Sequence, residues 1–146
     1  MEIHDGLGIS PRKVTYLKYF FDQNGPVKTN DLAARFGVDP STITKTLGEL
    51  SDAGLLTIVP YHGAMLSPSG REYAAFLVKR HRILALAMTH YGLSDEEACT
   101  EVSRFESLVS KDAIDRICQA MGHPSRGICG EITHDSGCLG HGRGPV

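Results

Sequence analysis

The stretch TNDLAARFGVDPSTITKTLGELSDAGLLTIVPYHGAML, residues 29–66, decides the fold of this chain. Its apolar spacing and turn residues predict a helix, a tight turn, a second helix and a short two-stranded hairpin, in that order. That order is a winged helix-turn-helix, in which the second helix is shaped to enter the major groove of DNA. A plain helical hairpin with an attached strand pair is the alternative, but it would not explain why the short loop, the helix caps and the wing all agree.

Residues that start or stop helices mark the boundaries within this stretch. Gly37 follows the first helix, at a position that favours left-handed backbone. Asp39 can cap the second helix, and Pro40 suits its first position because the N–H that proline lacks has no partner there. Gly54 then ends the second helix, and turn residues 60–63 separate two β-rich runs.

The second helix has a buried and an exposed face. Ile43, Leu47 and Leu50 recur at i, i+4 and i+7 and form one apolar stripe. At about 100° per residue, the opposite face carries Ser41, Lys45, Gly48 and Glu49. This outward face is the one that we expect to meet DNA.

We predict that DNA is contacted from the second helix, from the start of the first helix and from the wing. Lys45 is placed to read guanine O6 and N7, although a solvated lysine is the alternative. His62, at the wing tip, suits either a phosphate contact or a solvated turn. The predicted DNA-binding residues are Lys28, Thr29, Ser41, Thr42, Thr44, Lys45 and His62.

Bulk composition limits the remaining possibilities. The 146 residues carry a net charge of −2, with nine Lys/Arg against eight Asp/Glu in residues 1–80 and six against nine afterwards. A DNA-binding protein with so little positive charge usually works as a dimer, which doubles its phosphate contacts. No apolar run approaches the roughly 20 residues of a membrane span, and the start MEIHDGLGIS does not read as a signal peptide. We therefore expect a cytoplasmic protein whose four cysteines are thiols or ligands, not disulfides.

Enzymatic activity is not expected. The sequence has no nucleophile–base pair, no phosphate loop and no HExxH-type helix. We also expect no membrane partner and no small organic substrate.

The rest of the chain reads as helices followed by a glycine-rich end. Helices are predicted at 14–21, from 68 to about 90, from a Ser94–Glu97 capping box to Val109, and at 111–121. From Gly122 onward the sequence GHPSRGICGEITHDSGCLGHGRGPV holds seven of the sixteen glycines, two cysteines and three histidines. Such a segment should be disordered unless something holds it.

Residues 14–122 resemble the iron- and manganese-dependent repressors of the diphtheria toxin repressor (DtxR/MntR) type. The matching pieces are VTYLKYFF, the helix pair, YHGAMLSPSGREYA, LVKRHRIL, EEACTEVSRFESLVS and GHP. The chain is similar in length to the two-domain members, which lack an SH3-like domain. The resemblance implies a mostly α protein with an N-terminal winged helix-turn-helix and an α-helical dimerisation domain.

The resemblance also implies how such a protein works. It would be a homodimeric transcriptional regulator, acting as a repressor, in which a divalent ion fixes the spacing of two DNA-binding heads on a palindrome. Composition and the resemblance together predict four parts: a flexible arm (1–10), a winged helix-turn-helix (11–70), a dimerisation and effector-sensing domain (71–123) and a Gly/Cys/His-rich tail (124–146).

The ligand set implied by the resemblance is only partly present. His81 and Glu106 stand at the family's histidine and central glutamate ligands, and Cys99 stands at a second-site histidine. The other ligand positions fall on Thr15, Lys18, Ala85, Ser103 and Ser107. Cys99 and Glu106 are seven residues apart, about 10 Å along a helix, so we do not expect them to share one ion.

The tail could complete a rebuilt site around His81 and Cys99. The candidate metal ligands are His81, Cys99, Glu106, Cys129, His134 and Cys138, with His141 as a further donor. Thiolate and imidazole suit Zn²⁺, Cu(I) or an Fe–S cluster better than Mn²⁺. The expected cofactor is therefore a transition-metal ion (Fe²⁺, Mn²⁺ or Zn²⁺) or an Fe–S cluster.

Other interpretations of these residues stay open. The thiols could be redox-active without a metal, or the tail could be silent. Cys118 lies in an apolar stripe that favours core packing, His81 could be a core histidine, and Glu106 could be an ion-pair partner. At the level of function, the alternatives are a winged-helix regulator that has lost its metal site and a metal-trafficking module.

Overall fold

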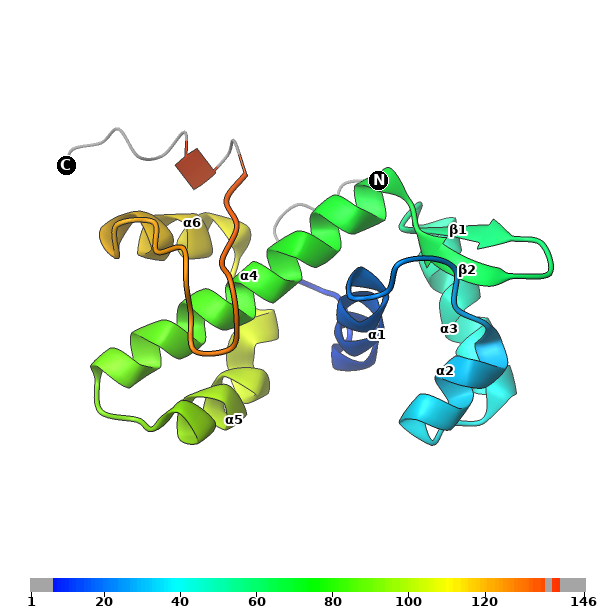
Figure 1. The fold of residues 1–146 in the computed structure, drawn as a ribbon, viewed down its shortest axis with the longest axis horizontal. Coiled ribbons are helices and arrows are strands. Elements are labelled where there is room, and N and C mark those ends of the chain that lie inside the picture. Colours follow the sequence, from blue (N-terminus) through cyan, green and yellow to red (C-terminus); the bar gives the residue numbers. More distant parts are fainter. Residues whose placement is uncertain (1–6, 136–137, 140–146) are drawn as a thin grey trace. The chain divides into compact units, whose positions relative to one another are not determined.

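A computed structural model describes residues 7–135 and 138–139 of the chain (Figure 1). Its elements are α1 (Pro11–Phe21), α2 (Thr29–Phe36), α3 (Pro40–Asp52), β1 (Leu56–Val59), β2 (Gly63–Leu66), α4 (Pro68–His90), α5 (Asp95–Phe105), the 3₁₀ turn η1 (Glu106–Leu108) and α6 (Lys111–Ala120). The chain forms two compact units, one built from Ser10–Ala75 and the other from Phe76 onward. The predicted fold class, mostly α with an N-terminal winged helix-turn-helix and a helical second part, is confirmed.

The first unit is built by the local signals in its sequence. Gly37 ends α2 with a φ of 64°. The Asp39 side chain then accepts a hydrogen bond from the Ser41 N–H at 3.0 Å and caps α3. The predicted stripe of Ile43, Leu47 and Leu50 is buried. Burying each such side chain stabilises the unit by roughly 1.5–3 kcal/mol.

The wing is an antiparallel pair in which Leu56 faces Leu66. Val27, before α2, extends the pairing, because its N–H and C=O both bond to Ala64 at 2.8 and 3.0 Å. Gly63 makes this close approach possible. A Cβ there would lie 2.1 Å from the Val27 carbonyl oxygen, and its φ of +109° disfavours other residues.

The second unit is helical and ends in a folded segment. Ser94 and Glu97 form the predicted capping box of α5. The predicted continuation of α5 to Val109 is wrong, since the α-helix ends at Phe105 and η1 follows. A three-residue 3₁₀ turn keeps nearly the same apolar spacing as an α-helix, so periodicity does not distinguish them.

The chain after α6 forms a hairpin-like loop. Arg126 pairs with Glu131, the Gly127 N–H donates to the Gly130 carbonyl at 2.8 Å, and Ile132 is buried. In Figure 1 this orange segment leaves α6, runs beside α4 and returns towards α6. We call His123–Asp135 together with Cys138–Leu139 the C-terminal segment; the disorder expected without a ligand is not what its described residues show. Among the helices that the structure describes, none is long and apolar enough to cross a membrane.

Candidate functional site

The predicted DNA-reading side chains lie on the outer face of α3. Ser41, Thr44 and Lys45 are exposed, and Thr42 is half-buried. The Ser41 hydroxyl bonds to the Asp39 carboxylate, and this bond is the main reason that the pKa of Asp39 is lowered from its ordinary value. The Thr44 hydroxyl donates to the Pro40 carbonyl at 3.0 Å. These two hydroxyls are thus engaged locally, which leaves Lys45 as the longest polar side chain of this group.

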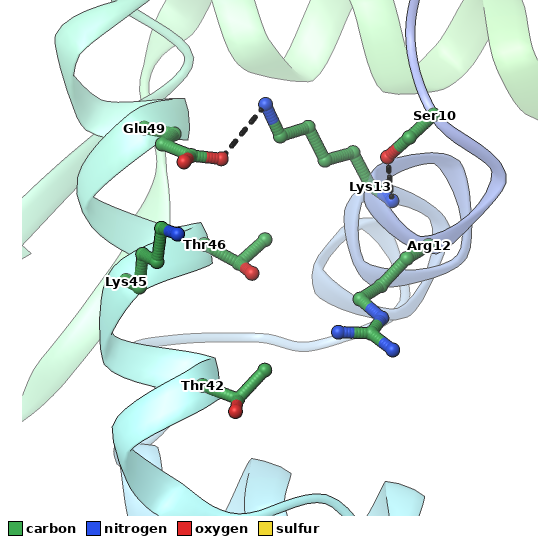
Figure 2. A pocket seen from close by; sticks show the side chains of 7 residues that line it. All are labelled: Ser10, Arg12, Lys13, Thr42, Lys45, Thr46 and Glu49. Carbon is green, nitrogen blue, oxygen red and sulfur yellow. Dashed lines mark hydrogen bonds and ion pairs between the residues drawn. The ribbon is translucent and has the colours of Figure 1, made fainter.

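The N-terminal turn of α1 faces α3 across an open cleft of about 420 Å³ (Figure 2). Its walls carry the basic side chains of Arg12, Lys13 and Lys45, and Lys13 forms an ion pair with Glu49 at 3.1 Å. Arg12 and Lys13 were not among the predicted DNA-binding residues. The available signal was that these two basic residues directly follow Ser10 and Pro11, which start a helix. A helix that begins with two basic residues presents positive charge at that end.

The remaining predicted DNA contacts also lie in the first unit. Lys28 is exposed at the N-cap of α2, and Thr29 begins that helix. His62 is exposed at the wing tip beside Tyr61, which is 96% exposed and has a φ of 66°. A tyrosine held in left-handed backbone and fully exposed is a further candidate DNA contact at the wing tip.

The second unit contains two groups of metal-binding side chains among its described residues. The first group is His81 on α4, Cys99 on α5 and Cys129 in the C-terminal segment, with donor atoms within 4.8 Å of one another. The Sγ atoms of Cys99 and Cys129 lie 2.9 Å apart. The His81 Nδ1 atom lies 3.3 Å from the buried Glu106 carboxylate.

Arg82, the neighbour of His81, holds the loop that carries Cys129. Its guanidinium donates to the Glu131 carbonyl at 2.5 Å. A Cβ at Gly130 would lie 3.0 Å from that guanidinium, so the backbone packs closely against it. One turn of α4 therefore supplies both a donor and the support for a second donor.

The thiol of Cys129 is harder to ionise than a free cysteine. The residue as a whole is exposed, yet partial desolvation of its sulfur, and then the contact with Cys99, raise the pKa of Cys129 to about 11. A metal ion that binds this sulfur must displace its proton.

The second group joins the end of α6 to the C-terminal segment. It consists of Cys118, His123, His134 and Cys138, again within 4.8 Å of one another. The Cys118 sulfur lies 3.5 Å from His123 Nδ1 and 3.4 Å from His134 Nδ1. The Cys138 sulfur lies 3.5 and 3.7 Å from the same two nitrogens. Burial raises the pKa of Cys118 to about 12, and burial also lowers the pKa of His134.

The structure thus places the six predicted ligands in two locations. His81, Cys99 and Cys129 come together, with Glu106 against His81, whereas His134 and Cys138 belong to the other group. His141 lies outside the described residues. Cys118, whose apolar neighbours favoured a place in the core, is fully buried. His123 was not among the predicted ligands. The available signal was that Cys118 and His123 are only five residues apart and lie on either side of a helix end, where two metal-binding side chains can approach each other.

Comparison with known proteins identifies the family to which the chain belongs. Residues 9–64 match the family described as iron dependent repressor, N-terminal DNA binding domain, and residues 67–132 match its metal binding and dimerisation domain. The MntR transcriptional regulator of Geobacillus kaustophilus is 31% identical over 111 residues, which are 74% of this chain and 79% of that protein. The chain belongs to the iron-dependent repressor family. The predicted resemblance is therefore confirmed.

Solved structures of other proteins share the fold. A hypothetical protein from Sulfolobus solfataricus superposes with a TM-score of 0.76 at 25% identity and covers 86% of this chain and 100% of its own. A manganese-dependent transcriptional repressor in complex with manganese superposes with a TM-score of 0.65 at 28% identity, over 85% of this chain and 63% of its own length.

Membership in the iron-dependent repressor family establishes the general function. The chain is a DNA-binding transcriptional regulator with a metal-binding and dimerisation domain, so its partners are DNA and a second copy of itself. The expectation that it is not an enzyme is confirmed by this membership. The expected cofactor class, a transition-metal ion, is supported as well. The donors of the first group, an imidazole and two thiols, fit such an ion, although they suit Zn²⁺ or Fe²⁺ better than Mn²⁺.

Proposed function

We propose that this protein is a homodimeric repressor that binds a palindromic operator and whose effector is a single transition-metal ion bound by His81, Cys99 and Cys129. The observation that carries this proposal is the meeting of these three donors, from α4, α5 and the C-terminal segment, within the matched metal-binding domain. We retain residues 11–70 as the DNA-binding domain, 71–123 as the dimerisation and sensing domain, and 124–146 as the tail.

Residues of α3 contact the bases of the DNA, and residues around α3 contact its phosphates. Lys45 reaches base edges in the major groove, assisted by Ser41, Thr42 and Thr44. Phosphates are contacted from the α2 N-terminus at Lys28 and Thr29, from the wing at His62, and from α1 at Arg12 and Lys13. Two copies of this surface, related by a two-fold axis, match a palindrome. Because such a regulator must reach DNA, we place the protein in the cytoplasm, without a membrane partner or a small organic substrate.

The donor set decides which ion fits. Two thiolates and an imidazole are soft to borderline ligands, which favour Zn²⁺ or Fe²⁺, whereas Mn²⁺ favours oxygen. The structures of relatives include one described with bound Zn²⁺ and one with manganese. An iron–sulfur cluster of the common type needs four cysteine ligands, so we favour a single ion at this three-donor group.

Glu106 supports the site through His81. Its carboxylate accepts from the Nδ1–H of His81, which leaves Nε2 as the nitrogen that binds the ion. Since Glu106 is buried and the His81 side chain largely so, the hydrogen bond also fixes the ring orientation. Glu106 is then a positioning residue and not a ligand of the ion. This role agrees with the expectation that Cys99 and Glu106, seven residues apart, do not bind the same ion.

The ion regulates through linkage. Any ion that binds one arrangement of the dimer more tightly than another changes operator affinity by the same coupling free energy, typically about 1–3 kcal/mol, or roughly 5- to 150-fold. This reciprocity means that operator DNA must change ion affinity by the same factor.

The test combines operator selection with metal titration. Duplexes selected from a random pool are titrated with the protein, under anaerobic conditions, with chelator, Zn²⁺, Fe²⁺ or Mn²⁺. We expect Zn²⁺ or Fe²⁺ to change the affinity for the selected operator at least fivefold, and Cys99→Ser or Cys129→Ser to abolish that change. Ser103→Ala, one turn from Cys99 on α5, is the matched control and should respond as wild type. A protein without sequence preference, or a metal response that survives both cysteine substitutions, would overturn the proposal.

A further inference from the structure

The second group of donors has the form of a closed tetrahedral site. We propose that Cys118, His123, His134 and Cys138 bind a structural Zn²⁺ ion, which joins the C-terminal segment to α6 and is distinct from the effector ion. All four donors come from the described part of one chain, and none of them belongs to the first group.

The distances within the group match tetrahedral zinc. With Zn–S near 2.3 Å and Zn–N near 2.0–2.1 Å, two ligands on a tetrahedral ion lie about 3.6 Å apart when one is sulfur and the other nitrogen. The four sulfur–nitrogen distances observed here are 3.4, 3.5, 3.5 and 3.7 Å. Every sulfur is thus one tetrahedral edge away from both nitrogens.

The histidines present the correct nitrogen. The Nε2 of His134 lies 3.1 Å from the Pro124 carbonyl, to which it donates, so Nδ1 is the unprotonated nitrogen that points at the sulfurs. His123 reaches the group because the chain turns sharply after α6, with Gly122 at a φ of 80° and His123 itself at 52°. A non-glycine residue in this conformation costs about 1–3 kcal/mol and persists only where its surroundings fix it.

The segment around Cys138 is organised for the same purpose. The Asp135 carboxylate accepts from the Cys138 N–H at 2.7 Å and pairs with Lys111, at the start of α6, at 3.1 Å. Cys118 and Cys138 are both fully buried. Two thiolates carry two negative charges, which balance the charge of Zn²⁺ in this buried place.

The arrangement excludes a two-iron cluster with two cysteines and two histidines. In such a cluster the cysteines bind one iron and the histidines bind the other, which would separate the sulfurs from the nitrogens. Here each sulfur lies within 3.7 Å of both nitrogens. Four protein donors also leave no open position, which is the form of a structural site and not of a catalytic one.

The experiment replaces the two cysteines of the first group and measures zinc bound by the second group. The Cys99→Ser/Cys129→Ser variant of the full chain is purified from zinc-supplemented cells and examined by elemental analysis and zinc-edge X-ray absorption. We expect one zinc per chain, with two sulfurs at about 2.3 Å and two nitrogens at about 2.0–2.1 Å. Adding Cys138→Ser or His134→Gln should remove the ion, whereas His90→Gln, at the exposed end of α4, should retain it.

Three results would overturn the proposal. They are a helical Cys99→Ser/Cys129→Ser protein without stoichiometric zinc, a bound zinc without sulfur ligands, and a zinc content unchanged by both Cys138→Ser and His134→Gln. Circular dichroism establishes that each variant is folded. Operator binding is not part of this readout, so failure of the proposed regulatory function would leave this result unaffected.

Discussion

The sulfur atoms of Cys99 and Cys129 lie 2.9 Å apart although 30 residues separate the two cysteines along the chain. This distance exceeds the roughly 2.05 Å of a disulfide, and both residues are free thiols. Two sulfurs on one tetrahedral zinc ion lie about 3.8 Å apart, so the pair must open by somewhat less than ~1 Å to share an ion. It can be oxidised to a disulfide if no ion occupies it.

Metal and oxidant should compete for this pair. Diamide, which takes up two hydrogens as two thiols become a disulfide, should crosslink Cys99 to Cys129 in metal-free protein and abolish uptake of the effector ion. Prior addition of Zn²⁺ should slow the crosslink, because bound thiolates are not available to the oxidant. Peptide mapping after alkylation measures the crosslink, and equal rates with and without Zn²⁺ would contradict metal binding by this pair.

Lys45→Ala should lower the affinity for the selected operator by about 1–3 kcal/mol and relax preference at one base pair. Arg12→Ala, across the α1–α3 cleft, should instead weaken binding to all duplexes alike and reduce the salt-dependence slope by about 1. Fluorescence anisotropy over a salt series and repeated operator selection separate the two effects. An unchanged base preference in Lys45→Ala would show that this lysine does not read sequence.

Gly63→Ala should destabilise the wing by about 2 kcal/mol or more, since the new methyl group meets the Val27 carbonyl in a backbone conformation that alanine disfavours. Gly48→Ala is the matched control. Gly48 lies inside α3 with nothing within 4 Å of an added Cβ, so alanine should stabilise the protein by about 0.5–1 kcal/mol. Urea denaturation measures both changes, and similar midpoints for the two variants would refute the close approach at Gly63.

Arg82→Met should lower the affinity for the effector ion by roughly tenfold or more, although it removes no ligand. The reason is that the loop that carries Cys129 loses its contact with α4. Arg104→Met changes a largely exposed arginine of α5 and should have no such effect. Competition with a zinc indicator gives both affinities. If the two variants bind zinc equally well, the Arg82–Glu131 contact does not position Cys129.

Local signals made the first unit predictable. Gly37, Asp39 and Pro40 each act on their own backbone and immediate neighbours, so the sequence itself contains the helix ends. The buried stripe of α3 follows from a 3.6-residue period in the same way. In the second unit, the switch from α-helix to 3₁₀ turn at Glu106 leaves that period nearly intact, and it was missed for this reason.

The two groups of donors were only partly predictable, because they depend on how a glycine-rich segment turns. Cys118 and Cys138 lie in one group with His123, whose left-handed backbone is not marked by any pattern in the sequence. The apolar neighbours of Cys118 led to the prediction that it packs in the core. A buried cysteine can also bind a metal ion, so the two roles are compatible. His81 and Cys99 were predicted to form the nucleus of a site because the family resemblance placed both residues at ligand positions.

The order of the donors along the C-terminal segment has a consequence for assembly. The chain passes from His123 in the second group to Cys129 in the first, and then back to His134 and Cys138. With zinc in the second group, the loop bearing Cys129 is tied at its base, so far less chain entropy is lost when its tip docks. The structural zinc would then bind first and the effector ion second. In a cell short of zinc, the protein would bind its effector ion too weakly to respond to it.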